Sequence, residues 1–135
     1  MNINGLEKLG LDKYFFKQIS ELDYDSENFS VARVISRNKN YYKVLTQENE
    51  YIAELTGKLL FSISQEDEFP VTGDWVIIQA FDNAGAFIHE TLRRKTSLYR
   101  KVSGKKSSKQ VIAANIDKAF IIHSLETQAN INLIE

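Results

Sequence analysis

The sequence predicts an all-β fold, a small closed barrel preceded by a short helix. Short β-rich runs recur at roughly 8 to 12 residue spacing, and a helical pattern occurs only at the start, whereas a βαβ fold would place helices between its strands. The 135 residues are 43% hydrophobic, which is enough for one modest core. A five-stranded OB-fold barrel is the best candidate. An SH3-like barrel is the alternative, because strand counting does not separate the two.

The first 28 residues are expected to form a helix followed by an acidic loop. Leucines and aromatic residues are mixed with lysines over residues 6–19, and Asp12 is suited to cap a helix that includes Tyr14, Phe15 and Ile19. Residues 20–28, SELDYDSEN, are polar and show no periodicity. They are therefore predicted to be a loop.

Residues 29–92 are predicted to form the barrel, with turns rich in Asn, Asp and Gly between the strands. Its strands are expected at residues 29–36, 41–46, 50–55, 59–64, 75–80 and 86–92. The strand at 59–64 is inferred because Leu59, Phe61 and Ile63 alternate with other residues after the break at Gly57.

Aromatic residues in the barrel could serve two purposes. Trp75 follows the turn Gly73-Asp74, so we expect a buried anchor at a strand start. Exposed aromatics could instead stack on unpaired bases, and the candidates are Tyr41, Tyr42, Tyr51, Phe61 and Phe87. In a domain of this size such side chains more often belong to the core.

The charges are strongly segregated although the net charge is only −1. Residues 1–92 contain fifteen acidic and eight basic residues, a balance of −7, and residues 110–135 have a balance of −2. Residues 93–109 contain eight basic residues and no acidic residue. The eight are Arg93, Arg94, Lys95, Arg100, Lys101, Lys105, Lys106 and Lys109. An acidic body with one basic segment indicates a localised contact with a polyanion.

Several classes of function have little support. The chain has no Cys, and its two histidines, His89 and His123, lie far apart, so neither a metal site nor a catalytic triad is indicated. No run approaches the roughly 18 to 20 apolar residues of a membrane span, and the N-terminus lacks a signal-peptide pattern. We expect a cytoplasmic protein without membrane contact. The string SGKKSS at 103–108 lacks the earlier Gly of a phosphate-binding loop.

Three motifs occur in a specific order: PVTGDWV at 70–76, LRRKTSLYRK at 92–101 and QVIAANIDKAFIIHSL at 110–125. In this combination the chain resembles the RsgA (YjeQ) family of ribosome small subunit-dependent GTPases. In that family an N-terminal OB domain precedes a circularly permuted GTPase domain and a zinc-binding domain. One departure is Leu92-Arg93-Arg94, where the family often has Leu-Pro-Arg.

The resemblance implies a division of the C-terminal part. Residues 93–111 would be a basic connecting segment, and residues 112–135 the truncated start of the GTPase domain, with a buried strand at 118–124. Asn115 and Asp117 are expected to hydrogen-bond backbone at this junction. The family's GTP-binding motifs, its Mg²⁺ and its structural Zn²⁺ would belong to parts outside this chain, which itself is expected to hold no cofactor and to have no enzymatic activity.

The function implied is docking of a GTPase on the small ribosomal subunit and its rRNA during late assembly. The eight cations of residues 93–109 are the predicted RNA-binding residues. One alternative is a barrel that binds a ribosomal protein or the parent's own GTPase domain, with the basic segment as a linker. Another is a stand-alone nucleic-acid binder of cold-shock type. We expect a monomer in solution.

Overall fold

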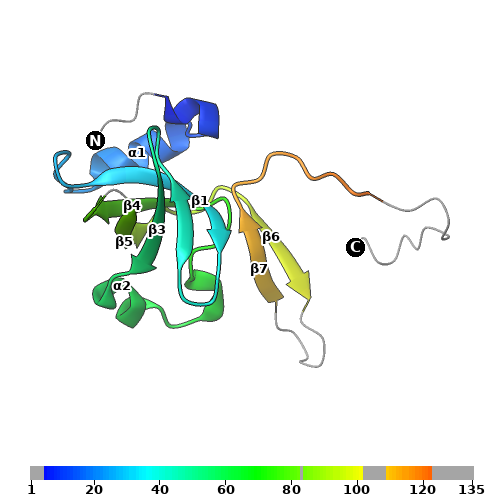
Figure 1. The fold of residues 1–135 in the computed structure, drawn as a ribbon. Helices are drawn as coiled ribbons and strands as arrows, with labels where there is room; N and C mark the ends of the chain where they lie inside the picture. Colours follow the sequence, from blue (N-terminus) through cyan, green and yellow to red (C-terminus); the bar gives the residue numbers. More distant parts are fainter. Residues whose placement is uncertain (1–4, 83, 102–108, 123–135) are drawn as a thin grey trace, which may run out of the picture.

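The computed structural model describes residues 5–82, 84–101 and 109–122. A compact barrel carries helices on its outside, and a separate two-stranded hairpin stands next to it (Figure 1). Within these residues the strands are β1 (Ser30–Arg37), β2 (Tyr42–Leu45), β3 (Glu50–Leu55), β4 (Trp75–Ala80), β5 (Gly85–Thr91), β6 (Ser97–Lys101) and β7 (Lys109–Ala114).

The barrel is closed by five strands in the order β1-β2-β3-β5-β4, and β4 returns to pair with β1. All neighbours are antiparallel except β3 and β5, which run parallel. The connection between β3 and β4 therefore crosses one end of the barrel, as in a Greek key. This arrangement confirms the predicted five-stranded OB-fold barrel rather than the SH3-like alternative.

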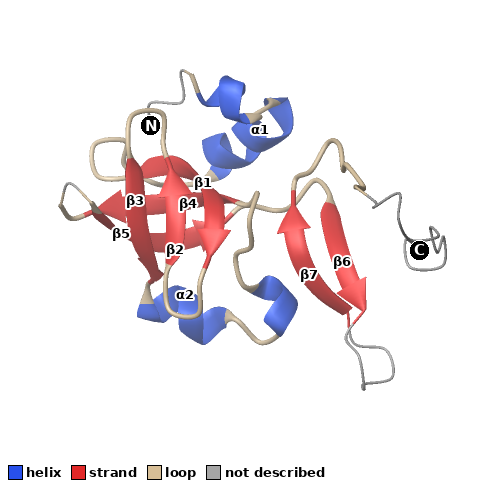
Figure 2. Cartoon of the chain, turned by 45° about the vertical axis from the view of Figure 1, so that its right-hand side comes forward, coloured by secondary structure: helices blue, strands red, loops and turns tan. Residues whose placement is uncertain are grey.

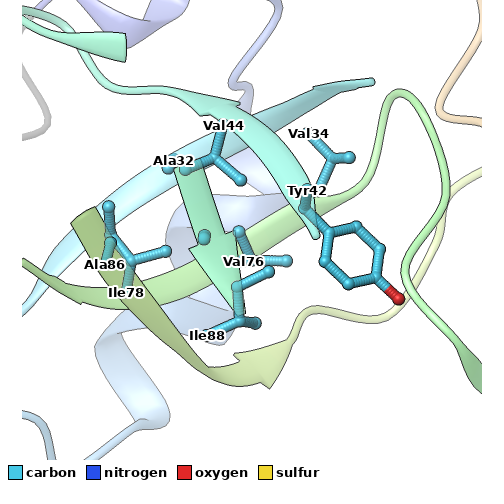
Figure 3. Packing of buried hydrophobic residues seen from close by; sticks show 9 residues of the cluster. Ala32, Val34, Tyr42, Val44, Val76, Ile78, Ala86 and Ile88 are labelled. Atoms are coloured by element: carbon cyan, nitrogen blue, oxygen red, sulfur yellow. The ribbon is translucent and has the colours of Figure 1, made fainter. Parts of the chain in front are cut away.

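The barrel interior is filled by small and β-branched side chains that alternate along the strands (Figure 3). Val34, Val44 and Ile88 are fully or almost fully buried there, whereas their sequence neighbours point outward. Tyr42 is the aromatic member of this cluster.

The N-terminal segment covers the outer face of β1 and β4. A 3₁₀ turn (Leu6–Leu9) precedes α1 (Lys13–Glu21), and the Asp12 carboxylate accepts a hydrogen bond from the Tyr14 amide at 2.9 Å, which confirms the predicted cap. Phe15 of α1 packs with Trp75 in a second core cluster. Trp75 is fully buried, so its prediction as an anchor is confirmed.

The strand predicted at residues 59–64 is wrong, because this region contains the helix α2 (Gly57–Ser62). The Thr56 hydroxyl accepts a hydrogen bond from the Leu59 amide at 3.2 Å and caps the helix. Leu59 packs against the barrel core, whereas Phe61 is 96% exposed, so the two side chains do not share a face as a strand would require. A 3₁₀ turn (Glu66–Glu68) follows.

The segment expected to connect two domains contains a hairpin, in which β6 pairs with β7 in antiparallel register (Figure 2). Farther along, residues 118–122 form neither helix nor strand, and Phe120 and Ile122 are 88% and 95% exposed. The buried strand predicted at 118–124 is therefore wrong for residues 118–122. Residues 123–124, with His123, lie outside the described part.

Candidate nucleic-acid interface

The hairpin is attached to the barrel through the turn that precedes β4. The Ala114 amide donates to the Thr72 carbonyl at 2.9 Å, and the side-chain amide of Asn115 donates to the Gly73 carbonyl at 3.0 Å. Val71 packs with Val111 and Ala114 in a small apolar cluster. The hairpin therefore has a defined position relative to the barrel.

Asn115 is the centre of this attachment. Its side-chain oxygen accepts from the Lys95 amide at 2.8 Å, and its carbonyl accepts from the Arg33 guanidinium at 3.0 Å. Its backbone has the left-handed φ of 55°, which Asn adopts more easily than most residues. The expectation that Asn115 hydrogen-bonds backbone at the junction is confirmed.

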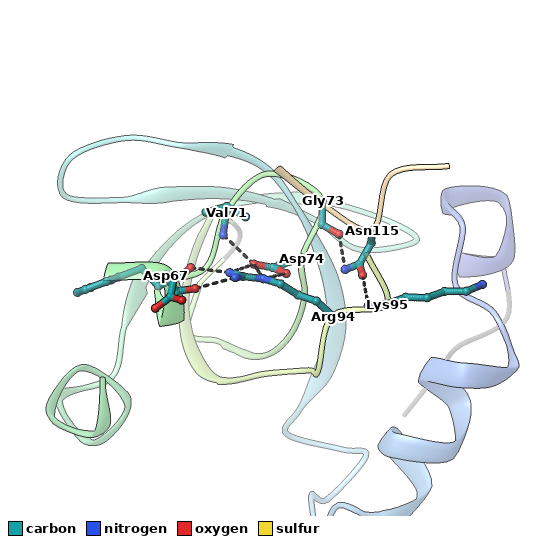
Figure 4. Close-up of polar contacts among 8 residues, drawn as sticks. Asp67, Val71, Gly73, Asp74, Arg94, Lys95 and Asn115 are labelled. Atoms are coloured by element: carbon teal, nitrogen blue, oxygen red, sulfur yellow. Dashed lines mark hydrogen bonds and ion pairs between the residues drawn. The ribbon is translucent and has the colours of Figure 1, made fainter. Parts of the chain in front are cut away.

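Arg94, one of the predicted phosphate-binding residues, is instead bound inside the protein (Figure 4). Its guanidinium forms a two-pronged contact with the fully buried carboxylate of Asp74, at 2.9 Å from Nε to Oδ1 and 2.8 Å from Nη2 to Oδ2. It also donates to the carbonyls of Asp67 and Phe69 at 2.6 and 2.8 Å.

Burial alone would lower the pKa of Arg94, but the hydrogen bonds and charge of Asp74 outweigh it and raise that pKa. Because its donors are occupied, Arg94 does not present a fork to phosphate.

Arg93 and Lys95 point to the other side and contact α1. Lys95 Nζ lies 2.6 Å from a carboxylate oxygen of Asp12, and Arg93 lies 3.9 Å from the Glu21 carboxylate. The hydrogen bond and charge of Asp12 raise the pKa of Lys95, and the Lys95 hydrogen bond lowers the pKa of Asp12. Both cations keep at least half of their side chains exposed, so they remain accessible to an anion.

The remaining described cations of the basic segment lie on the hairpin. Arg100 donates to the side-chain oxygen of Gln110 at 2.9 Å, and Lys109 lies over the Tyr99 ring at 6.0 Å from its centroid. Lys101 and Lys109 are paired opposite each other at the end of the two strands and are exposed. Lys105 and Lys106 lie outside the described residues.

Sequence reasoning missed a second group of cations, in the turn between β1 and β2. Arg37 and Lys39 line an open groove of about 550 Å³ together with Arg100 and Gln110 of the hairpin. The sequence signal was present in Arg37-Asn38-Lys39-Asn40, but it was interpreted only as a turn. Glu66 also lines the groove, and its carboxylate lies 3.8 Å from Arg37.

The candidate stacking aromatics divide into buried and exposed ones. Tyr42 belongs to the barrel core, and the half-buried Tyr51 packs against it. Phe61 is exposed on α2, and Tyr41 and Phe87 are exposed by 38% and 39%. Only these last three remain available for contact with a partner.

Comparison with known proteins shows which proteins are similar to this chain. No family model matches. The small ribosomal subunit biogenesis GTPase RsgA 1 of Bacteroides thetaiotaomicron is 37% identical over 132 residues, which cover 98% of this chain and 36% of that protein. RsgA 1 of Oceanobacillus iheyensis and RsgA of Opitutus terrae are 31% and 32% identical and cover 100% and 96% of the chain. The chain belongs to the RsgA family. It spans about a third of the length of these relatives.

Among solved structures, YjeQ from Thermotoga maritima matches with a TM-score of 0.49 and 22% identity, over 67% of this chain and 28% of that one.

The three motifs that carry the RsgA resemblance meet at the attachment of the hairpin. Asp74 comes from PVTGDWV, Arg94 from LRRKTSLYRK and Asn115 from the last motif. Asp74 binds Arg94, and Asn115 binds the residues that adjoin both of them, Gly73 and Lys95 (Figure 4). These motifs therefore share one structural task, which is to fix the basic hairpin beside the barrel.

The described residues do not contain three His, Cys, Asp or Glu side chains placed to hold a metal ion. Among the same residues, no helix is long and apolar enough to cross a membrane.

Proposed function

We propose that this RsgA-family region docks its parent GTPase on rRNA of the small ribosomal subunit during late assembly. The contact is made by a surface that we call the basic face. It comprises Arg100, Lys101 and Lys109 of the hairpin, together with Arg37 and Lys39 across the groove. Arg93 and Lys95, on the side of α1, and Lys105 and Lys106, outside the described residues, stay predicted RNA contacts. Arg94 takes part only indirectly, because it holds the connecting segment against Asp74.

One observation carries this proposal: cations from two separate segments line the same groove. Arg37 and Lys39 come from the β1–β2 turn and Arg100 comes from β6. Cations on both sides of an open groove are suited to contact the phosphates of a nucleic-acid backbone. Arg100 can present a planar fork to a phosphate, whereas the lysines act as mobile point charges.

The names of the relatives support the biological setting of the proposal. They are small ribosomal subunit biogenesis GTPases. By analogy, the parent would bind GTP with Mg²⁺ and hold a structural Zn²⁺ through residues outside this chain, and its nucleotide cycle would time docking and release. We propose that it acts in the cytoplasm and that this region is monomeric.

The test is binding to purified small ribosomal subunits at several salt concentrations. The variant Arg100→Ala/Lys101→Ala/Lys109→Ala removes three cations from the basic face. Its matched control, Lys13→Ala/Lys17→Ala/Lys58→Ala, removes three from α1 and α2. If six to ten phosphates are contacted, the wild-type affinity falls by about 10³- to 10⁵-fold between 50 and 200 mM salt.

We expect the basic-face variant to bind more weakly and with a shallower salt dependence, and the control to resemble the wild type. Equal losses in both variants would show that only overall charge matters. Unchanged binding by the first variant would remove the basic face from the interface.

A second candidate function is docking of a ribosomal protein or of the parent's own GTPase domain, with the hairpin as linker. It is favoured by the exposed apolar side chains of Phe120, Ile121 and Ile122, which follow the hairpin directly. Binding that is insensitive to salt and survives nuclease treatment would support this function over RNA docking.

A further inference from the structure

The outer surface of β3 and β5 carries exposed apolar side chains that the proposed function does not use. Ile52, Phe81 and Phe87 are exposed by 42%, 60% and 39%. They lie on the side where β3 and β5 pair, with Ile52 opposite Gly85 and Glu54 opposite Phe87. We call these three residues, with Glu54 and Asp82, the aromatic face.

The two phenylalanines are held in a defined arrangement. Their ring centroids lie 4.8 Å apart at an interplanar angle of 36°. The Phe81 ring occupies the space where a Cβ of Gly85 would lie, so the absence of a side chain at Gly85 allows the ring to rest on the strand. Asp82 fixes the turn between them by accepting hydrogen bonds from the amides of Ala84 and Gly85.

This face differs from the opposite one in being uncovered. The outward side chains of β1 and β4, including Val31 and Ile77, are buried beneath the N-terminal segment. In the described part of the chain no segment plays the same role over Phe81 and Phe87, which remain exposed.

The charges around the aromatic face are mainly acidic. Glu54 is exposed beside Phe87, and the backbone hydrogen bonds from Ala84 and Gly85 lower the pKa of Asp82 and keep it ionised. Glu50 also lies on this side but is paired with Lys43 at 3.4 Å. Lys43, the cross-strand partner of Ile52, is therefore engaged by Glu50.

We propose that the aromatic face binds a basic protein segment, in which a lysine or arginine flanks an apolar side chain. The apolar side chain would pack on Phe81 and Phe87, and the cation would lie between Glu54 and the ring faces. OB-folds often bind oligonucleotides on the face of their second and third strands, which adjoins this one. Here a phosphate backbone would meet Glu54 and Asp82, which disfavours RNA. The inference goes beyond the RNA docking proposed above, since it concerns a different surface and another class of partner.

The test uses two synthetic peptides of equal length, with the same leucine and phenylalanine positions. One carries lysine and arginine at the other positions, and the other carries glutamate. NMR shifts of the Phe81 and Phe87 rings report binding. The variants are Phe87→Ser and Glu54→Lys. Their matched controls are Phe61→Ser on α2 and Glu7→Lys on the covered side of the barrel.

We expect the basic peptide to perturb both rings and the acidic peptide to leave them unchanged. Glu54→Lys should weaken binding of the basic peptide roughly fivefold, which corresponds to about 1 kcal/mol. Phe87→Ser should abolish the perturbation of the Phe81 ring, and both controls should bind the peptide as the wild type does. Equal binding of the two peptides, no binding by either, or loss in the controls overturns the proposal.

A single-stranded RNA oligonucleotide serves as the third probe. Perturbation of the two rings by RNA and not by the basic peptide would make the face a stacking surface and overturn the proposal. The experiment contains no ribosome, and the basic-face triple variant should bind the basic peptide normally. Failure here is therefore distinguishable from failure of the proposed RNA docking.

Discussion

Arg94 and Asp74 show how a residue with the chemistry of an RNA contact is recruited for structure. Burying two charges costs free energy, and the pair offsets it only when its remaining hydrogen-bonding groups are also satisfied. Here the Asp74 carboxylate also accepts from the Val71 amide at 2.8 Å, and the Arg94 guanidinium reaches two further carbonyls. Sequence composition cannot reveal this, because a basic run does not state which cation faces inward.

Replacing Arg94 with Ala should lower the free energy of unfolding by about 3–5 kcal/mol, because it leaves the buried Asp74 carboxylate without its partner. The matched control is Arg93→Ala, whose side chain is 78% exposed and should change stability by less than about 0.5 kcal/mol. Urea denaturation followed by circular dichroism measures both. Similar stabilities for the two variants would mean that the buried pair contributes little.

Gly73 should be intolerant of a side chain. Its φ is 95°, and a Cβ there would overlap the carbonyl oxygen of Ala114, so Gly73→Ala combines backbone strain of about 1–2 kcal/mol with displacement of the hairpin. Gly57→Ala is the control, since no atom lies within 4 Å of its Cβ position. Thermal unfolding should show a large loss for the first variant and none for the second.

At the scale of elements, strands with long-range partners were predictable, whereas a short amphipathic segment was not. The strand predicted at residues 75–80 coincides with β4, because Trp75 and the branched residues after it suit a buried strand. Over the six residues of α2, apolar residues fit both a period of two and a helical face. The Thr56 cap and the position of Leu59 against the core decide for the helix.

The two periods make different predictions for Leu59 and Phe61. A strand would bury both, whereas in the helix Leu59 is half-buried against the barrel core and Phe61 is exposed. Leu59→Ala should therefore cost about 1–2 kcal/mol of stability, and Phe61→Ala less than about 0.5 kcal/mol. Chemical denaturation of the two variants tests this, and comparable losses would favour the strand.

The contact between α1 and the connecting segment should depend on pH. The hydrogen bond from Lys95 lowers the pKa of Asp12, so the stabilisation is fully present above the unfolded value of 3.8 and is lost as pH falls through the lower folded value. Asp12→Asn keeps a capping side chain but loses the charge. We expect it to be less stable than wild type at pH 7 and equal to it well below pH 3.8. A stability difference that persists in acid would contradict this account.

For the whole molecule, the separation of charges implies that the salt dependence of ribosome binding comes from one surface. Each phosphate contact adds about 0.7–0.9 to the slope of log affinity against log salt. Arg100→Ala should reduce the slope for binding to small ribosomal subunits by about that amount, and Lys58→Ala on α2 should leave it unchanged. Binding titrations at several salt concentrations measure both slopes. Identical slopes for the wild type and the two variants would show that Arg100 does not contact a phosphate.

The basic segment could be recognised from the sequence because eight cations occur there without an acid. Its shape could not, since the hairpin depends on bonds to Thr72 and Gly73, which lie more than twenty residues earlier. The groove formed with Arg37 and Lys39 was hidden for the same reason. Composition identified the charge, and tertiary contacts determine which charges act together.

The bonds around Asn115 also have a mechanical consequence. This one residue is held by the Gly73 turn, by the start of the connecting segment and by the Arg33 guanidinium. A force or torque applied to the chain beyond Asn115 is therefore transmitted to the barrel through several bonds at once, and the hairpin does not act as a swivel. Any movement of that following segment should therefore rotate the barrel and the basic face together as one rigid body.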